Sequence, residues 1–129
     1  MQLAKWFIIL GGFNAMLTVI LGAFAAHGLK SRLGPEMLGV FNTGVQYHFY
    51  HALGLLVTGL LVSSLPPNDW IKWSGWLMLT GIVLFPGSLY LLALGLPRWL
   101  GAVTPFGGFL FILAWACLVM AIINTWNMT

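Results

Sequence analysis

Charged side chains are scarce in this chain. Only 5% of its 129 residues are charged, whereas soluble domains carry roughly 25%. Hydrophobic residues make up 60% of the sequence. A soluble fold of this length has too little interior to cover so much apolar surface. The sequence therefore indicates an integral membrane protein that forms a single domain over residues 1–129.

Several kinds of site are excluded by residues that are missing. The two acidic side chains, Glu36 and Asp69, lie outside the most apolar runs, which argues against paired-carboxylate catalysis and a carboxylate proton relay. No nucleophile elbow or phosphate-binding loop is present. Cys117 is the single cysteine, so neither an intrachain disulfide nor a cysteine-ligated metal site is expected. No catalytic residue is assigned, and these absences favour a non-enzymatic protein.

The basic residues are few and scattered. They do not form the stripe that nucleic-acid binding requires, so no nucleic acid is expected as a partner. Lys30, Arg32 and Arg98 fall on one side of the expected membrane topology, and Lys5 and Lys72 on the other. The positive-inside rule then favours cytoplasmic first and third connections, with both termini outside.

Four apolar segments are long enough to cross a bilayer. A run of about 20 residues at 1.5 Å per residue spans the hydrocarbon core. We expect helices at about 6–26, 35–63, 70–94 and 100–124, which predicts an all-α, four-helix transmembrane bundle. The second segment is longer than a bilayer needs. Either it projects from the membrane, or its first part lies along the surface and about 47–63 forms the membrane part.

The N-terminal segment has some features of a secretory signal peptide. Lys5 precedes an apolar run, and Ala23-Phe24-Ala25 imitates a cleavage site. The apolar run from Trp6 to Ala26 is too long for a signal core. We therefore interpret this segment as the first membrane helix.

Polar side chains gather near two of the three connections. Four crossings place both termini on one side of the membrane and the first and third connections on the other. The polar residues near those two connections are His27, Gln46, His48, His51, Ser88, Tyr90 and Thr104. An unpaired polar group is costly in hydrocarbon. We therefore expect these residues to form one polar cluster in one leaflet.

The three histidines admit several interpretations. His48 and His51 share a helix face, and with His27 they could supply nitrogen ligands to a metal or haem. No acidic or cysteine ligand accompanies them, so the pattern is weak. They could also bind a small polar ligand or a lipid headgroup. The plainest interpretation is that they hydrogen-bond Gln46, Tyr47, Tyr90 or backbone carbonyls and hold helices together.

The first helix carries two further signals. Gly11, Ala15, Gly22 and Ala26 recur at spacings of four and seven, and small residues on one face allow close helix packing, within the chain or in a homo-oligomer. Asn14 lies near mid-membrane, where an interhelical hydrogen bond is expected.

Four short motifs, in their order and spacing, resemble a known family. They are Gly22-Ala23-Phe24-Ala25-Ala26-His27-Gly28-Leu29, Gln46-Tyr47-His48 with His51-Ala52-Leu53, Gly87-Ser88-Leu89-Tyr90-Leu91-Leu92-Ala93-Leu94, and Thr104-Pro105-Phe106-Gly107-Gly108. Together they make the chain similar to the YgdD/YwdK family. The resemblance implies a small, four-helix, multi-pass protein of the bacterial inner membrane, with relatives in animals and no known activity. Ala25 and Pro86 depart from the family pattern, where Gly and Ser are usual.

Three functions remain open at this point. The first is a non-enzymatic membrane protein that binds a lipid, a small polar ligand or a protein partner near the histidine-rich pocket. The second is a metal- or haem-associated redox or assembly protein that uses His27, His48 and His51. The third is an oligomeric channel, which ranks last because the far leaflet offers little polarity beyond Asn14 and Thr80. The expected partners are membrane lipids, and the sequence identifies no cofactor.

Overall fold

Four long helices make up the protein, and all four are long and apolar enough to cross a membrane. The computed structural model describes residues 2–128, and these contain no strand. The elements are α1 (Gln2–Phe24), the π-helical turn η1 (Ala25–Leu29), α2 (Pro35–Ser64), α3 (Asp69–Ala93), the 3-10 helix η2 (Arg98–Ala102) and α4 (Thr104–Trp126). The predicted four-helix transmembrane fold is confirmed.

The helix boundaries differ from the expected ones at three places. α1 begins at Gln2 and ends in a π-helical turn that extends to Leu29. α2 is one unbroken helix of 30 residues, so residues 35–43 do not form a separate surface piece. Residues 98–102 form η2, and α4 begins only at Thr104, because Pro105 suits the first turn of a helix.

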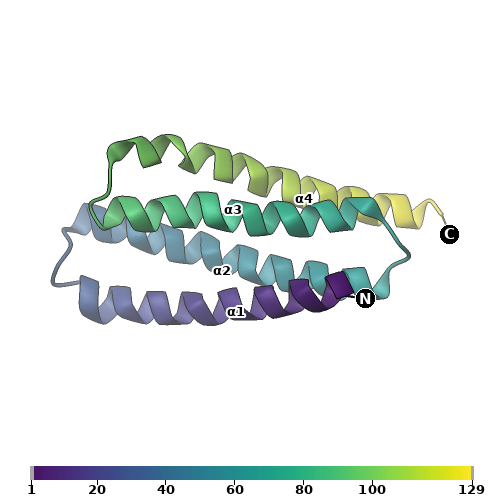
Figure 1. The fold of residues 1–129 in the computed structure, drawn as a ribbon, viewed down its shortest axis with the longest axis horizontal. Helices are drawn as coiled ribbons and strands as arrows, with labels where there is room; N and C mark the ends of the chain where they lie inside the picture. Colours follow the sequence, from purple (N-terminus) through teal and green to yellow (C-terminus); the bar gives the residue numbers. More distant parts are fainter. Residues whose placement is uncertain (1, 129) are drawn as a thin grey trace.

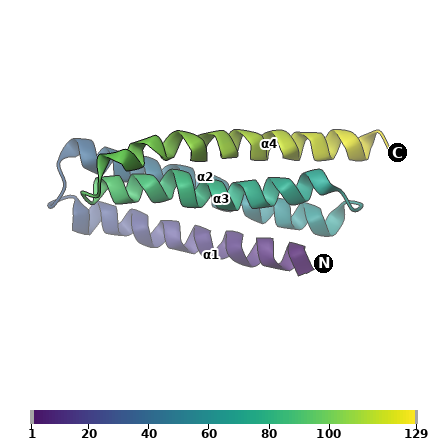
Figure 2. The same ribbon diagram turned by 45° about the horizontal axis from the view of Figure 1, so that its top comes forward.

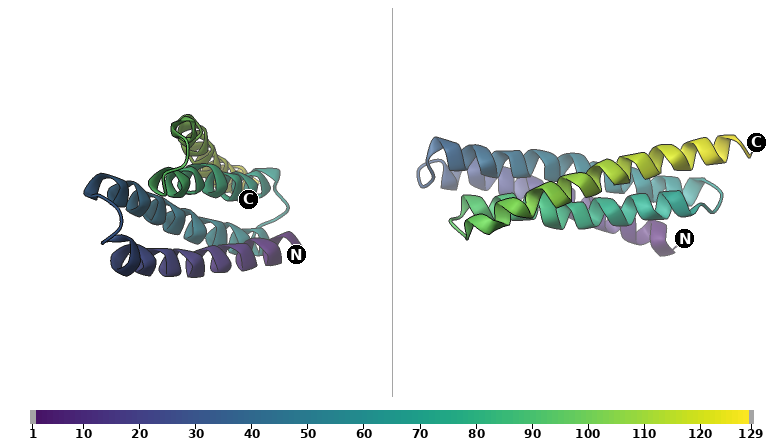
Figure 3. Two further views of the ribbon diagram at one scale, coloured as in Figure 1. Left: turned by 60° about the vertical axis from the view of Figure 1, so that its left-hand side comes forward. Right: turned by 90° about the horizontal axis from the view of Figure 1, so that it is seen from above.

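The helices run up and down in chain order. Figures 1 and 2 show both termini at one end of the bundle and the first and third connections at the other end. Each helix packs on the next in sequence, α1 on α2, α2 on α3 and α3 on α4. In the left-hand view of Figure 3, α1 and α4 lie on opposite sides of the α2–α3 pair. Residues in α2 and α3 are therefore the most enclosed.

Glycines bring backbones together in the α1–α2 and α3–α4 pairs. A Cβ atom at Gly11 would lie 2.7 Å from the Leu56 nitrogen of α2. A Cβ atom at Gly59 of α2 would lie 2.9 Å from the Ile8 nitrogen of α1. At Gly107 of α4 it would meet the backbone of Leu84 at 2.8 Å. These positions are too close for any larger residue, so glycine sets the spacing of both pairs.

Candidate functional site

His48 joins three helices. Its Nδ1 lies 2.8 Å from the Tyr90 hydroxyl of α3, and its Nε2 lies 2.8 Å from the Asn14 Oδ1 of α1. The His48 side chain is buried. The Asn14 amide nitrogen in turn donates to the Leu10 carbonyl at 2.8 Å. The interhelical hydrogen bond expected for Asn14 is thus present, and its partner is His48.

These partners define the direction of each hydrogen bond in the His48 chain. The Asn14 oxygen can only accept, so His48 Nε2 must carry its hydrogen. In the neutral ring, Nδ1 then accepts from the Tyr90 hydroxyl. The chain runs from Tyr90 through His48 and Asn14 to the Leu10 carbonyl. Both ring nitrogens are occupied, and the arrangement stabilises the meeting point of α1, α2 and α3.

His51 connects α2 to α4 instead. Its Nδ1 donates to the Tyr47 carbonyl at 2.7 Å, and its Nε2 accepts from the Trp115 indole N–H at 3.0 Å. An indole nitrogen only donates, so the ring must be neutral, with its hydrogen on Nδ1. The ring also stacks on Phe111, with 3.4 Å between ring centroids and 7° between planes. Both nitrogens and one ring face of His51 are therefore used within the protein.

A third polar contact connects α3 to α4. The Ser88 and Thr104 hydroxyl oxygens lie 2.5 Å apart, and Ser88 also donates to the Phe85 carbonyl at 2.9 Å. Either hydroxyl can donate in the shared bond, because Thr104 also has an alternative acceptor, the Leu100 carbonyl, at 3.4 Å. This pair closes the end of the α3–α4 hairpin.

The seven polar residues expected in one cluster are therefore divided among separate contacts. Helix geometry gives the reason. His48 and His51 are three residues apart and differ by about 60° around α2, so they face different neighbours. Ser88 and Tyr90 are two residues apart on α3 and point to nearly opposite sides. Gln46 is exposed and donates to the Tyr50 hydroxyl at 2.6 Å.

His27 lies apart from the other two histidines. Its side chain is exposed on η1, and within residues 2–128 no hydrogen bond to it is recorded. The positions of His48 and His51 along α2 also differ from the expected ones. Because α2 begins at Pro35, His48 and His51 lie near the middle of that helix and not at its start. Asn14 is likewise near the middle of the α1–η1 span, Gln2–Leu29.

The donor set does not fit a metal or haem. Each lone pair of His48 and His51 that could bind a metal already accepts a hydrogen bond, from Tyr90 or from Trp115. Residues 2–128 contain no group of three or more His, Cys, Asp or Glu side chains close enough to share a metal ion. A metal at His48 or His51 would have to displace one of these aromatic partners.

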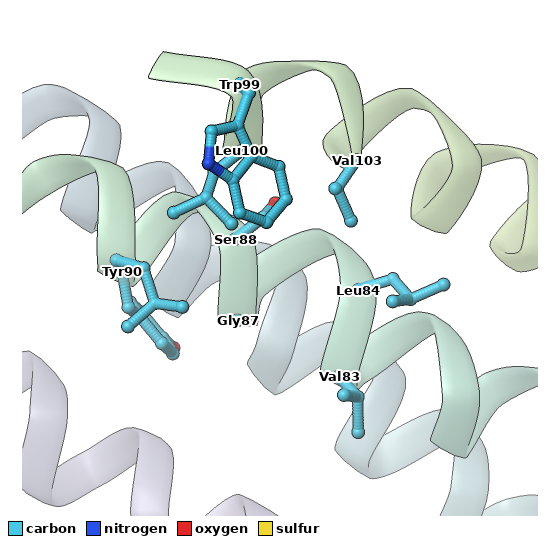
Figure 4. A pocket seen from close by; sticks show the side chains of 9 residues that line it. Val83, Leu84, Gly87, Ser88, Tyr90, Trp99, Leu100 and Val103 are labelled. Atoms are coloured by element: carbon cyan, nitrogen blue, oxygen red, sulfur yellow. The ribbon is translucent and has the colours of Figure 1, made fainter. Parts of the chain in front are cut away.

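Two apolar hollows flank the polar contacts. One of about 540 Å³ lies beside His51, and we call it the His51 groove. Its lining residues are Tyr47, His51, Phe85, Pro105, Gly108, Phe109, Phe111, Ile112 and Trp115. The other, of about 580 Å³, lies between α3 and the segment before α4. Figure 4 shows Trp99, Leu100 and Val103 on one side of this second hollow and Gly87 and Ser88 on the other.

Sequence reasoning missed the two aromatic partners of His51. Phe111 and Trp115 are four residues apart on α4, so they share a face, and that spacing was the available signal. It is weak, because α4 also exposes other large apolar side chains to the surroundings. The Tyr90 contact of His48 was among the partners expected.

Comparison with known proteins identifies relatives over nearly the whole chain. The family model described as "Protein of unknown function (DUF423)" matches residues 21–108. The UPF0382 membrane protein YwdK of Bacillus subtilis is 51% identical over 120 residues, which cover 93% of this chain and 98% of that protein. A UPF0382 membrane protein of Staphylococcus epidermidis is 50% identical over 117 residues, covering 91% and 94% of the two chains.

A UPF0382 membrane protein of Staphylococcus saprophyticus is 49% identical over 116 residues, 90% of this chain and 95% of that protein. No solved structure matches the chain. The resemblance to the YgdD/YwdK family is confirmed by these relatives. A high identity that extends through all four helices, together with the matching family model, means that the chain belongs to the DUF423 family of membrane proteins.

Proposed function

We propose that this protein is a non-enzymatic, multi-pass protein of the bacterial inner membrane that binds a lipid in the His51 groove. The ligand is a lipid-soluble molecule with an apolar chain and an oxygen acceptor at its polar end. The observation that carries the proposal is the groove itself. At about 540 Å³ it falls within the size range of small-molecule sites, roughly 300–1,000 Å³.

The lining of the groove suits an apolar ligand. It is mostly aromatic and aliphatic, and its histidine is already satisfied by Tyr47 and Trp115. The neutral imidazole ring of His51 therefore forms part of the groove wall. It would not act as a catalyst or as a ligand to a metal without losing one of those bonds. This chemistry favours lipid binding over the metal- or haem-dependent alternative.

One lining group has hydrogen-bonding capacity to spare. Tyr47 is 40% exposed, and within residues 2–128 no partner of its hydroxyl is recorded. A hydroxyl in an apolar environment is stabilised when it finds an acceptor. A carbonyl or ester oxygen of a bound lipid would supply that acceptor, which gives the ligand a defined polar end.

Filling the groove tests the proposal. A Cβ atom at Gly108 would lie 3.5 Å from the Phe85 ring, which is ordinary van der Waals contact, so Gly108→Leu extends into the groove without striking backbone. Native mass spectrometry in mild detergent, with lipid extraction and identification, measures the lipid retained per chain. The wild-type protein is expected to retain lipid, and Gly108→Leu to lose most of it.

Gly12→Leu is the matched control, because a Cβ atom there has nothing within 4 Å. It adds the same side chain to α1, far from the groove, and should retain lipid as the wild type does. Tyr47→Phe should weaken retention while keeping the shape of the groove. Equal retention by wild type and Gly108→Leu, or no lipid on the wild type, would reject the groove as a lipid site.

A further inference from the structure

A polar pair lies on the outer surface of α2 at an unusual depth. The Gln46 amide nitrogen donates to the Tyr50 hydroxyl at 2.6 Å, and both side chains are exposed, Tyr50 by 49%. They lie on the side where α2 meets α1, and the Tyr50 ring also contacts the Tyr47 ring edge-on, with 5.9 Å between centroids. In a soluble protein, such a pair would be an ordinary surface feature. Here it belongs to a helix that spans the membrane.

The depth of the pair follows from its neighbours. Gln46 and Tyr50 fall on either side of the midpoint of α2, Pro35–Ser64. His48, between them, bonds to Asn14, which is near the middle of the α1–η1 span. Both helices therefore place the pair well inside the membrane-spanning part of the bundle. Polar side chains in that position are expensive and usually face protein.

The internal hydrogen bond leaves much of the pair unsatisfied. Gln46 uses one amide N–H, while its Oε1 and second N–H have no recorded partner within residues 2–128. Tyr50 accepts that bond and retains its own hydroxyl hydrogen. One acceptor and two donors thus face the hydrocarbon. Lipid tails can pair with none of them.

Two exposed threonines on the helices do not share this property. Thr43 donates to the Gly39 carbonyl at 2.9 Å, and Thr80 donates to the Trp76 carbonyl at 2.9 Å. Each satisfies its hydroxyl within its own helix. Gln46 and Tyr50 therefore differ from these threonines in needing a partner from outside the chain.

The surface around the pair is hollowed. Thr18 and Val19 of α1 and Val45 and Phe49 of α2 border a shallow groove of about 320 Å³ that includes Gln46 and Tyr50. Thr18 is buried and donates to the Ala15 carbonyl at 2.6 Å, so the remainder of the groove is effectively apolar. A second helix could fill this hollow with side chains.

We propose that the α1–α2 groove around Gln46 and Tyr50 is a homodimer interface. The occupant is a second copy of this chain, because the exposed groups are complementary to themselves. Across a two-fold axis the same patch meets itself, and every contact occurs twice. The Tyr50 hydroxyl of one copy would donate to the Gln46 Oε1 of the other, and the reverse bond would follow by symmetry. Interhelical side-chain hydrogen bonds are an established basis of helix association in lipid.

The proposal goes beyond lipid binding and concerns the groove between α1 and α2. Its test is the dimer equilibrium, measured by Förster transfer between donor- and acceptor-labelled protein in phosphatidylglycerol–phosphatidylcholine vesicles over a range of protein-to-lipid ratios. The wild type is expected to show a concentration-dependent dimer. Gln46→Leu should raise the dimer dissociation constant about tenfold, because both symmetric bonds are lost.

Tyr50→Phe should have a similar effect, since it removes the donor of the same bonds and preserves the ring. Thr80→Val is the matched control, because this exposed hydroxyl is satisfied within α3, and its dimer constant should equal that of the wild type. A wild type that stays monomeric at every ratio would overturn the proposal. Unchanged dimerisation in Gln46→Leu and Tyr50→Phe would do the same.

Cross-linking locates the interface independently of those variants. In a Cys117→Ser background, Phe49→Cys places a thiol in the groove, and Val83→Cys places one on α3, away from it. Oxidation in vesicles should produce a covalent dimer with the thiol at position 49, and far less with the thiol at position 83. The reverse result would assign the dimer to another face.

Discussion

The two helix hairpins and the seam between them are held together by different kinds of contact. In the α1–α2 and α3–α4 hairpins, backbone meets backbone at Gly11, Gly59 and Gly107. At the α2–α3 seam the contacts are made by side chains, as in the His48–Tyr90 hydrogen bond and the Tyr47–Phe85 ring contact.

The difference matters because lipid offers no hydrophobic driving force for helix association. The hairpins are specified by shape, since only glycine allows the observed approach. The seam is specified by hydrogen bonds and ring packing between larger side chains. Substitutions should therefore be most damaging at the glycines, intermediate at the histidine, and mildest at a single hydroxyl.

The largest effect is expected for Gly11→Leu. A Cβ atom at this position would lie 2.7 Å from the Leu56 nitrogen and 3.0 Å from the Ala52 carbonyl oxygen, and backbone cannot give way as a side chain can. Overpacking of this kind should lower the free energy of unfolding by about 3 kcal/mol. Reversible unfolding in mixed micelles of mild detergent and dodecyl sulfate measures the change.

Gly22→Leu is the control on the same helix. A Cβ atom there would lie 3.5 Å from a Val45 methyl group, an ordinary contact with a side chain that can move. Its expected cost is below about 1 kcal/mol. If the two variants were equally destabilised, close backbone approach would not be what distinguishes the hairpin contacts.

The intermediate effect is expected for His48→Ala. The change removes the bonds to Tyr90 and Asn14 and leaves both of those groups to find other partners. The expected loss of stability is about 2 kcal/mol. The same unfolding titration measures it, and lipid retention in the His51 groove should remain near the wild-type level. A loss of lipid retention would mean that the seam and the groove are coupled.

The smallest effect is expected for Tyr90→Phe, which removes one hydroxyl from the seam and keeps its ring against Phe41, at 4.9 Å between centroids. Its cost should be about 0.6 kcal/mol, the average of interhelical hydrogen bonds in membranes. A double-mutant cycle with His48→Ala isolates the bond. If the two changes added without coupling, the Tyr90–His48 contact would contribute nothing to the seam.

The fold was predictable from the sequence because four long apolar runs leave few alternatives. The helix ends were less predictable. The sequence did not specify whether the residues after Pro35 were part of the membrane helix, since Met37, Leu38 and Phe41 fit either arrangement. The contacts of the turn before α3 were not predictable either. Asn68 is buried there, accepts from the Trp70 N–H at 2.9 Å and donates to the Ala121 carbonyl of α4 at 3.0 Å.

The sequence predicted that polar side chains would hydrogen-bond across helices, but it did not predict which of them would meet. Chain topology correctly suggested that polar groups would pair across helices, and Asn14 does pair with His48. It did not specify the rotation of each helix about its axis, which sends His48 towards α1 and α3 and His51 towards α4. A rotation of this kind depends on packing along the whole helix, including the glycine contacts, and no single motif encodes it.

The hydrogen-bonding of the two buried histidines has an electrical consequence. His51 is held as a neutral ring by its indole donor, and His48 completes its chain of bonds in the neutral form. The charged side chains lie towards the ends of the helices: Lys5 and Lys72 are in the first turns of α1 and α3, Lys30 follows η1, and Arg98 begins η2. A membrane potential does about 2.3 kcal/mol of work per 100 mV on each elementary charge that crosses the bilayer. Within residues 2–128, no ionised side chain lies in the middle of the bundle, so the membrane potential does little work on a movement of its interior. The conformation should therefore be the same in energised and de-energised vesicles.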